Sequence, residues 1–226
     1  MADPQRLADI RHAETWVFDL DNTLYPATCD LFSQIDVRMR DFIAAFLAIE
    51  NDAAYRLQKQ YFREYGTTLC GMMTCHGMDP QAFLEHVHDI DVSPVPPSPN
   101  LEAALERLPG RKFIFTNATT DHAERVMDRL GVSHHFEDIF DIRRTGFVPK
   151  PEPAIYGQLL RDFAIEPAKT VMVEDISRNL APAAALGMTT VWVKTDTKWG
   201  HASSAEAHVH HVIEDLTAWL TDIAGA

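Results

Sequence analysis

The stretch Trp16–Pro26, WVFDLDNTLYP, places two carboxylates at the end of an apolar run. Asp19 and Asp21 are two residues apart, so in an extended segment their side chains point to the same side. Turns commonly contain Asp and Asn, and this pair taken alone is compatible with a buried strand that simply ends. The other interpretation is a nucleophile next to an acid, and the remaining sequence favours it.

Three further apolar runs of strand length follow, at residues 112–117, 170–175 and 189–194. Segments with helical spacing of apolar residues separate the runs, and two of them stop at a glycine, Gly131 or Gly187, as helices often do. Strands that are apolar throughout and alternate with helices predict an α/β fold with a Rossmann-like parallel sheet, covered on both faces. Residues 210–220 predict a last edge strand and a closing helix.

About eighty residues between the first run and the helix before the second do not fit this alternation. Apolar residues recur at helical spacing from Phe32 to Leu47, a second helix is expected from about Ala53 to Tyr65, and shorter helical segments follow. Four prolines in residues 91–100 favour a stiff return segment. The sequence therefore predicts an all-helical cap domain at 27–96, inserted into a core domain formed by 1–26 and 97–226.

The composition restricts the class of ligand. The 226 residues carry a formal net charge of −13, which repels nucleic acids and anionic membranes, so neither is an expected partner. The same charge opposes a phosphorylated metabolite unless a metal, lysine or helix N-terminus supplies local positive charge. The first residues contain no apolar signal segment, and a cytoplasmic location is expected. The oligomeric state is left open.

Polar residues follow three of the expected strands. In an open parallel sheet ligands bind at the carboxyl ends of the strands, so these side chains are expected at one edge. Carboxylates placed close together repel each other by about 4 kcal/mol per pair at 4 Å, and a hard divalent cation with oxygen ligands, Mg²⁺, would relieve this. The residues concerned are Asp19, Asp21, Thr116, Asn117, Glu174 and Asp175.

The order of these motifs is similar to that of a known family. DxDNT at Asp19–Thr23, Thr116 and Asn117 after a strand, Lys150 between two prolines, and VED at Val173–Asp175 resemble the haloacid dehalogenase superfamily of phosphohydrolases. The resemblance extends from about His12 to Leu220, and it implies that superfamily's fold with a helical cap. DLDNTLYP together with YFREYGTTLCGMM resembles the pyrimidine 5'-nucleotidase branch, which dephosphorylates UMP and CMP.

The resemblance implies a role for each motif residue. Asp19 is the expected nucleophile that forms an aspartyl-phosphate, and Asp21 the expected acid and base. Thr116 and Asn117 are expected to bind substrate, and Lys150 to offset charge on the phosphate and on Asp19. The expected metal ligands are Asp19, the backbone carbonyl of Asp21, Glu174 and Asp175. Arg178 and Asn179 either position Asp175 and the metal waters or cap a helix.

Several alternatives remain open from the sequence. A true haloacid dehalogenase needs neither the second acid nor the metal, so Asp21 and the Glu174–Asp175 pair argue against it. A phosphomutase or a phosphatase for phosphoglycolate or sugar phosphates would share the core motifs, whereas a non-enzymatic binding module would be expected to have lost one of them. The hypothetical base-pocket residues are Tyr25, Phe32, Tyr65, Thr68, Met72 and His76.

Two other candidate metal clusters are less favoured. Cys70, Cys75 and His76 lack a second ligand pair at zinc-site spacing, so reduced thiols are the preferred interpretation. The C-terminal histidines are interpreted as surface residues around an edge strand. They are His201, His208, His210 and His211.

Overall fold

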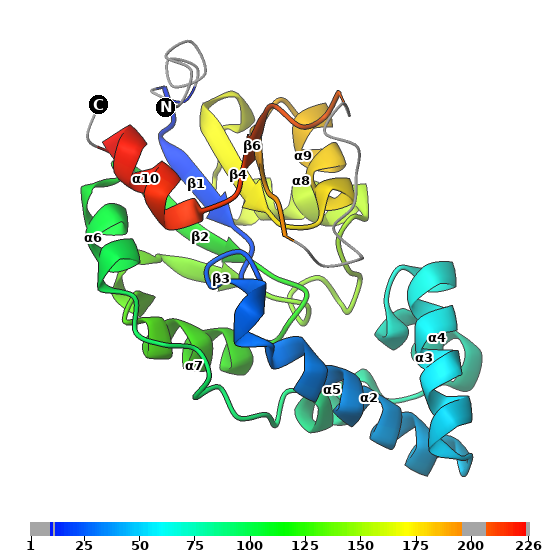
Figure 1. Cartoon of the computed structure of the whole chain (residues 1–226). Coiled ribbons are helices and arrows are strands. Elements are labelled where there is room, and N and C mark those ends of the chain that lie inside the picture. The colour runs from blue at the N-terminus through cyan, green and yellow to red at the C-terminus, as the bar shows by residue number, and fades with distance from the viewer. Residues whose placement is uncertain (1–9, 11, 196–206, 225–226) are drawn as a thin grey trace.

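The computed structural model describes residues 10, 12–195 and 207–224, and this part of the chain forms one parallel sheet with helices around it (Figure 1). The strands are β1 (Thr15–Phe18), β2 (Arg111–Phe115), β3 (Asp138–Phe140), β4 (Thr170–Glu174), β5 (Thr189–Val193) and β6 (His211–Ile213). Their order across the sheet is β3-β2-β1-β4-β5-β6, and every neighbouring pair is parallel. The predicted Rossmann-like sheet is confirmed.

The strand β1 lies in the middle of the sheet because all of its residues can be buried. Its side chains alternate between two cores, with Trp16 and Phe18 on one face and Val17 on the other. Phe18 pairs in register with Ile114 of β2 and Val173 of β4. The polar residues that follow these three strands therefore emerge at the same edge of the sheet.

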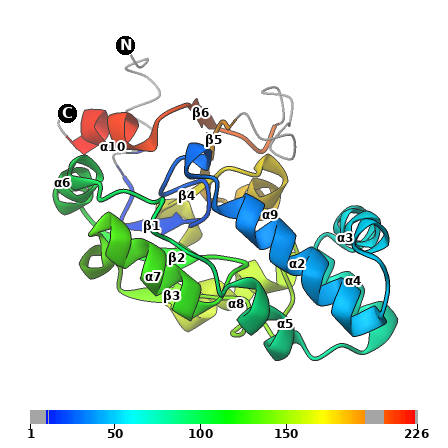
Figure 2. The same ribbon diagram turned by 60° about the horizontal axis from the view of Figure 1, so that its bottom comes forward.

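Helices cover both faces of the sheet (Figures 1 and 2). The face that carries Trp16 and Phe18 packs against α6 (Pro99–Arg107), α7 (Thr120–Leu130) and α10 (Leu216–Ala224). The opposite face packs against α8 (Pro153–Asp162) and α9 (Ala181–Ala185). Short 3-10 helices connect several of these elements: η1 (Ala27–Cys29), η2 (Ser133–His135), η3 (Pro167–Lys169) and η4 (Ser177–Leu180).

Four helices are inserted between β1 and α6 and extend from the carboxyl end of β1 to one side of the sheet (Figure 2). They are α2 (Leu31–Leu47), α3 (Asn51–Tyr65), α4 (Thr68–His76) and α5 (Pro80–Val87). The helices α3 and α4 approach closely because Gly71 has no side chain; a Cβ there would overlap the Tyr61 ring. Pro80 occupies the first turn of α5, as expected. The domain boundaries at 26/27 and 96/97 stay a prediction.

The strand β3 was not predicted from the sequence. It has three residues and begins at Asp138, so neither its length nor its composition distinguishes it from a loop. Its backbone is fixed by pairing with β2, in which Phe113 is opposite Asp138. Among the described residues, no helix combines the length and apolar character needed to cross a membrane.

Candidate active site

The turn after β1 holds Asp19 and Asp21 at the carboxyl edge of the sheet. The backbone N–H of Asp19 still donates to Val173 in β4, at 2.9 Å. Asn22 then adopts a left-handed conformation with φ of 61°, which Asn tolerates better than most residues. The turn brings the Thr23 hydroxyl back to Asp19 Oδ2, at 3.0 Å. Asp19 is buried in this arrangement. The bond of its backbone N–H to β4 and the bond from the Thr23 hydroxyl to its carboxylate together fix its position.

Lys150 is the buried cation of the site. Its ammonium Nζ donates to Asp19 Oδ1 at 2.7 Å, to Glu174 Oε2 at 2.7 Å and to the Phe115 carbonyl at 2.8 Å. These acceptors use all three N–H donors of the ammonium group. Burial opposes the charged form, but Asp19 and Glu174 outweigh it and raise the pKa of Lys150 above its ordinary value. Lys150 is therefore charged at neutral pH.

Three carboxylates come together beside Lys150. Asp19, Glu174 and Asp175 are all buried, and one oxygen atom of each lies within 4.8 Å of the others. Burial and the neighbouring Glu174 raise the pKa of Asp19 to about 7, and the same two causes raise the pKa of Asp175 well above its usual range. One lysine does not balance three buried acids. This oxygen-only donor set fits a hard divalent cation.

A further buried oxygen lines the same pocket. Asn179 is in η4, directly after the acidic pair, and its side-chain Oδ1 has no hydrogen-bond partner in the described part of the chain. Its backbone carbonyl accepts a hydrogen bond from Tyr156, at 2.6 Å, which holds η4 in place. The neighbouring Arg178 instead donates to the carbonyl of Gly66 at the end of α3. Only Asn179 of these two lines the pocket, and its unpaired oxygen is consistent with a polar or metal-bound ligand there.

Asp21 has a separate set of partners that the sequence did not indicate. The Tyr25 hydroxyl donates to Asp21 Oδ1 at 2.6 Å, and Nε2 of His122 lies 2.9 Å from the same oxygen. Burial alone would raise the pKa of Asp21, but His122 and Tyr25 together lower it below its ordinary value. The two aspartates of one motif are therefore held in different protonation environments.

His122 and His88 form a buried pair beside Asp21. Their rings stack with centroids 4.9 Å apart, and the Thr119 hydroxyl is 3.1 Å from Nδ1 of His88. Burial and the adjacent His122 lower the pKa of His88 to about 3. A sequence signal for His122 existed, because it shares the buried face of α7 with Val126. A histidine in such an apolar stripe needs a polar partner, but the pattern does not identify Asp21.

Thr116 and Asn117 lie where β2 ends, but their side chains are used differently. The Thr116 hydroxyl oxygen accepts a hydrogen bond from the N–H of Ala118, at 2.9 Å, so its own hydrogen can be donated to a ligand. The Asn117 amide accepts from the backbone N–H of Lys150 at 2.8 Å. Asn117 thereby positions the Lys150 loop, and both residues still line the pocket.

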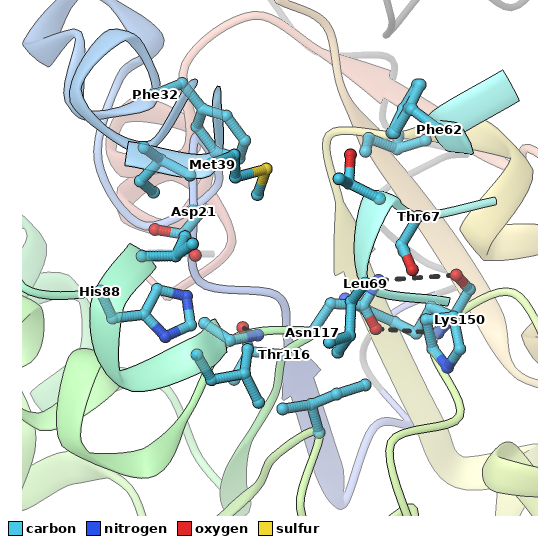
Figure 3. A pocket seen from close by; sticks show the side chains of 18 of the residues that line it. Asp21, Phe32, Met39, Phe62, Thr67, Leu69, His88, Thr116, Asn117 and Lys150 are labelled. Atoms are coloured by element: carbon cyan, nitrogen blue, oxygen red, sulfur yellow. Dashed lines mark hydrogen bonds between the residues drawn. The ribbon is translucent and has the colours of Figure 1, made fainter. Parts of the chain in front are cut away.

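A pocket of about 190 Å³ connects this acidic edge with the inserted helices. Figure 3 shows Phe32 and Met39 on one side of it and Phe62, Thr67 and Lys150 on the other, with Thr116 below. Of the residues expected to line a base pocket, Phe32 and Thr68 do so. The lining does not include Tyr25, Tyr65, Met72 or His76.

These four side chains point elsewhere for identifiable reasons. Tyr25 binds Asp21, as described above, and Met72 is fully buried among the inserted helices. His76 lies 2.7 Å from the Tyr61 hydroxyl, and Tyr65 accepts from Cys75 Sγ at 3.2 Å. Pocket residues that were not predicted come mainly from α2, α3 and α5. They include Ile35, Asp36, Met39, Gln58, Lys59, Phe62, Phe83, Leu84, Val87 and His88.

The other two candidate clusters have different outcomes. Within the described residues, Cys70, Cys75 and His76 do not form a group with metal-ligand spacing. The edge strand expected near the C-terminus is β6. His211 lies within β6 and is buried, because β6 packs against the rest of the sheet. The interpretation of His211 as a surface histidine is therefore wrong. His210 is exposed and bonds Thr190. His201 lies outside the described residues.

Comparison with known proteins agrees with this geometry. The chain belongs to the haloacid dehalogenase-like hydrolase family, whose model matches residues 14–187. It is 25% identical to phosphate metabolism protein 8 of Saccharomyces cerevisiae, over 94% of this chain and 66% of the yeast protein. It is 26% identical to a glyceraldehyde 3-phosphate phosphatase of Methanopyrus kandleri, over 79% of this chain and 82% of that protein.

Solved structures show the same fold. A HAD phosphatase from Thermococcus onnurineus superposes with a TM-score of 0.61 at 18% identity, covering 94% of this chain and 98% of that one. The L-2-haloacid dehalogenase of Xanthobacter autotrophicus gives a TM-score of 0.58 at 14% identity, covering 94% and 97%. The fold is therefore shared by phosphatases and dehalogenases, and the side chains of the site must distinguish between the two.

Proposed function

We propose that the protein is a Mg²⁺-dependent phosphomonoester hydrolase that works through an aspartyl-phosphate. The observation that carries this proposal is the Lys150 ammonium held between Asp19 and Glu174 while Asp21 faces the same pocket. The named phosphatases among the relatives support it. A dehalogenase would not need Asp21, and the Tyr25 and His122 contacts to that carboxylate support a role in proton transfer.

In this mechanism Asp19 attacks phosphorus, an Asp19 O–P bond forms and the ester P–O bond breaks. Asp21 gives a proton to the leaving oxygen and then takes one from the water that hydrolyses the acyl phosphate. Asp21 Oδ1 already receives hydrogen bonds from Tyr25 and His122, so Oδ2 is the oxygen proposed to carry the transferred proton. The lowered pKa of Asp21 favours its ionised form, which is the form that accepts a proton in the second step.

The remaining polar groups are assigned to charge and orientation. Asp19, Glu174 and Asp175, with the backbone carbonyl of Asp21, would hold Mg²⁺, which supplies positive charge to phosphoryl oxygens when bound. Lys150 lowers the pKa of Asp19 and so favours its ionised form, against burial and Glu174, which together raise that pKa. The Thr116 hydroxyl would donate to a phosphoryl oxygen, and Asn117 would act by holding the Lys150 loop.

For the substrate, we propose a pyrimidine nucleoside monophosphate, with the inserted helices as a cap that selects it. Apolar side chains such as Phe32 and Phe62 offer flat surfaces for a base. The orientation of the Gln58 side-chain amide is an argument for a ligand that carries an N–H donor. Its amide nitrogen donates to Asp36 Oδ1 at 2.9 Å, and a carboxylate can only accept, so the orientation of the amide is fixed.

The fixed orientation leaves Gln58 Oε1 buried and without a hydrogen-bond partner in the described part of the chain. An unpaired buried acceptor costs about 1–3 kcal/mol, which a donor on the substrate would recover after a small shift of the cap. The N3–H of uracil or the amino group of cytosine is such a donor. The cytoplasmic location stays a prediction from the sequence.

The test is a phosphate-release panel with Mg²⁺ that compares UMP, CMP and dUMP with AMP, phosphoglycolate, glyceraldehyde 3-phosphate, sugar phosphates and an aryl phosphate. We expect the highest kcat/KM for the pyrimidine nucleotides. Equal or higher values for AMP or phosphoglycolate would reject the pyrimidine assignment but keep the hydrolase. No phosphate release from any ester would reject both.

A paired substitution in α3 tests the contribution of Gln58. Gln58→Met removes the acceptor with little change in side-chain length, and we expect kcat/KM for UMP to fall about tenfold more than for the aryl phosphate. Gln60→Met is the matched control, because Gln60 is exposed on the same helix and bonds Glu64 at the surface. Equal losses on both substrates in Gln58→Met would show that Gln58 does not select the base.

A further inference from the structure

A second group of ligand-type side chains lies outside the pocket. Glu102 and Glu106 are one helical turn apart in α6, and His134 and His135 follow each other in η2. One ligand atom from each of the four residues lies within 4.8 Å of the others. The helix α6 leads into β2 and η2 leads into β3, so this group lies toward the amino ends of these strands. The acidic group that contains Asp19 lies instead at the carboxyl ends of the strands.

The distances within the group are those of ligands around an ion. Glu102 Oε1 lies 3.6 Å from Nε2 of His134 and 3.5 Å from Nε2 of His135. Both separations exceed the usual hydrogen-bond distance of about 2.7–3.2 Å. With Zn–N and Zn–O bonds of about 2.0–2.1 Å, the edge of a tetrahedron around zinc is about 3.3–3.4 Å. Two nitrogens thus face one carboxylate oxygen at nearly the spacing that a shared zinc ion requires.

An unpaired buried nitrogen independently indicates a missing ligand. The His135 side chain is 7% exposed, and its Nε2 has no hydrogen-bond partner in the described part of the chain. This is the nitrogen that faces Glu102. Buried imidazole nitrogens are normally satisfied, so an orphaned one that points into a group of acidic and imidazole ligands is explained by a bound cation.

The remaining two side chains can complete a coordination shell. Glu106 Oε2 lies 4.0 Å from Nδ1 of His135, the other ring nitrogen, and Glu106 is largely exposed, so its carboxylate can rotate toward an ion held at Nε2. The rings of His134 and His135 lie 4.0 Å apart at 40°, and Nε2 of each faces Glu102 in α6. Two imidazoles with two carboxylates suit Zn²⁺ and similar ions, whereas Mg²⁺ prefers oxygen ligands only.

We propose that Glu102, Glu106, His134 and His135 bind one zinc-type divalent ion. The ion connects η2 to α6 and is separate from the cation proposed for the active site. The two sites differ in ligand chemistry, with nitrogen and oxygen donors here and oxygen donors alone beside Asp19. A zinc ion in this position neutralises the two glutamates and supplies the missing partner of His135 Nε2.

The test counts bound zinc while the active site is weakened by Asp175→Asn and filled by excess Mg²⁺. Equilibrium dialysis of the full chain carrying Asp175→Asn, in excess Mg²⁺, is expected to give one Zn²⁺ per chain. Adding His134→Ala should weaken binding at least tenfold; His134 is 62% exposed, so this change leaves folding intact. His12→Ala, at another exposed histidine, is the control and should bind zinc normally.

Cobalt gives the geometry of the site. Co²⁺ added to the Asp175→Asn protein should show the intense visible absorption of a four-coordinate ion, and Glu102→Gln should remove it. Glu85→Gln, at an exposed helical glutamate, should leave the spectrum unchanged. Zinc binding that His134→Ala and Glu102→Gln do not weaken, or no zinc retained in excess Mg²⁺, would overturn the proposal.

Discussion

Lys150 Nζ lies 2.7 Å from Asp19 Oδ1, although 131 residues separate the two in the chain. The same ammonium contacts Glu174, and both side chains of that second pair are 1% exposed. The network therefore contains one cation and, with Asp175, three buried acids. Removal of Lys150 leaves buried acids that neither water nor a neighbour compensates, so stability and catalysis are coupled at this position.

Lys150→Met should strongly destabilise the protein. Breaking a buried ion pair by removing one partner costs about 3–5 kcal/mol, because the other charge stays buried and unpaired. Urea denaturation should show this loss in the free energy of unfolding, together with loss of phosphatase activity. Lys169→Met is the control at a half-exposed lysine with surface ion pairs and should leave both nearly unchanged. Equal stability of the two variants would show that the Lys150 network contributes nothing to folding.

Asp19→Asn should abolish turnover while the protein stays folded. The amide keeps the size of the side chain but is not a nucleophile, and loss of a covalent nucleophile reduces kcat by at least about 10³-fold. Phosphate release and the thermal midpoint would be measured on the same preparation. Asp162→Asn, at an exposed aspartate near the end of α8, controls for the substitution itself. Activity retained in Asp19→Asn would exclude the aspartyl-phosphate.

The shared edge of Asp19, Thr116 and Asp175 could be predicted because it depends on local patterns. Each residue follows an apolar run, and parallel strands place their carboxyl ends together. The helices of the insertion were equally readable from apolar spacing and from the glycine at position 66. Only α4 was underestimated, as shorter helical turns, since its sequence mixes small and apolar residues.

The partners of Asp21 and the lining of the pocket could not be predicted in this way. His122 meets Asp21 from 101 residues away, and no local pattern encodes that pairing. Met72 and His76 lie in α4, whose orientation is set by packing against α3, notably at Gly71. Helical spacing shows which residues share a face, but the tertiary packing decides whether that face meets the core or the pocket.

Removal of the metal should stop catalysis reversibly. EDTA should abolish phosphate release, and Mg²⁺ should restore it. Because the pKa of Asp19 is raised to about 7 in the metal-free site, Mg²⁺ competes with a proton there. The half-saturating Mg²⁺ concentration should therefore rise as the pH falls below about 7. Asp175→Asn should raise it at every pH, and activity that survives EDTA would reject the metal-assisted scheme.

His88 should make stability fall in mild acid. Its pKa is about 3 in the folded protein and 6.5 ordinarily, so below pH 6.5 the unfolded chain takes up a proton that the folded chain does not. The contribution of neutral His88 to the free energy of unfolding is complete above pH 6.5. It decreases toward pH 3 by up to about 1.4 kcal/mol per pH unit.

The control for this titration is His88→Asn, which retains a polar atom near the Thr119 hydroxyl but does not titrate. The free energy of unfolding, measured by urea denaturation at several pH values, should depend less on pH in the variant between about pH 6 and 4.5. Parallel curves for the two proteins would show that His88 is protonated in the folded state.

Tyr25→Phe should reduce kcat more than it changes KM. The variant loses only the hydroxyl that donates to Asp21 Oδ1, so the fold and the pocket wall stay the same. Asp21, the proposed acid and base, loses one of its two hydrogen-bond donors. One hydrogen bond to a charged group contributes about 1.5–3 kcal/mol, which corresponds to a loss of roughly 10- to 150-fold in kcat. Tyr61→Phe is the matched control, since Tyr61 is also buried and its hydroxyl contacts His76, away from the pocket. Equal effects of the two substitutions on steady-state kinetics would show that the Tyr25 hydroxyl supports structure rather than proton transfer.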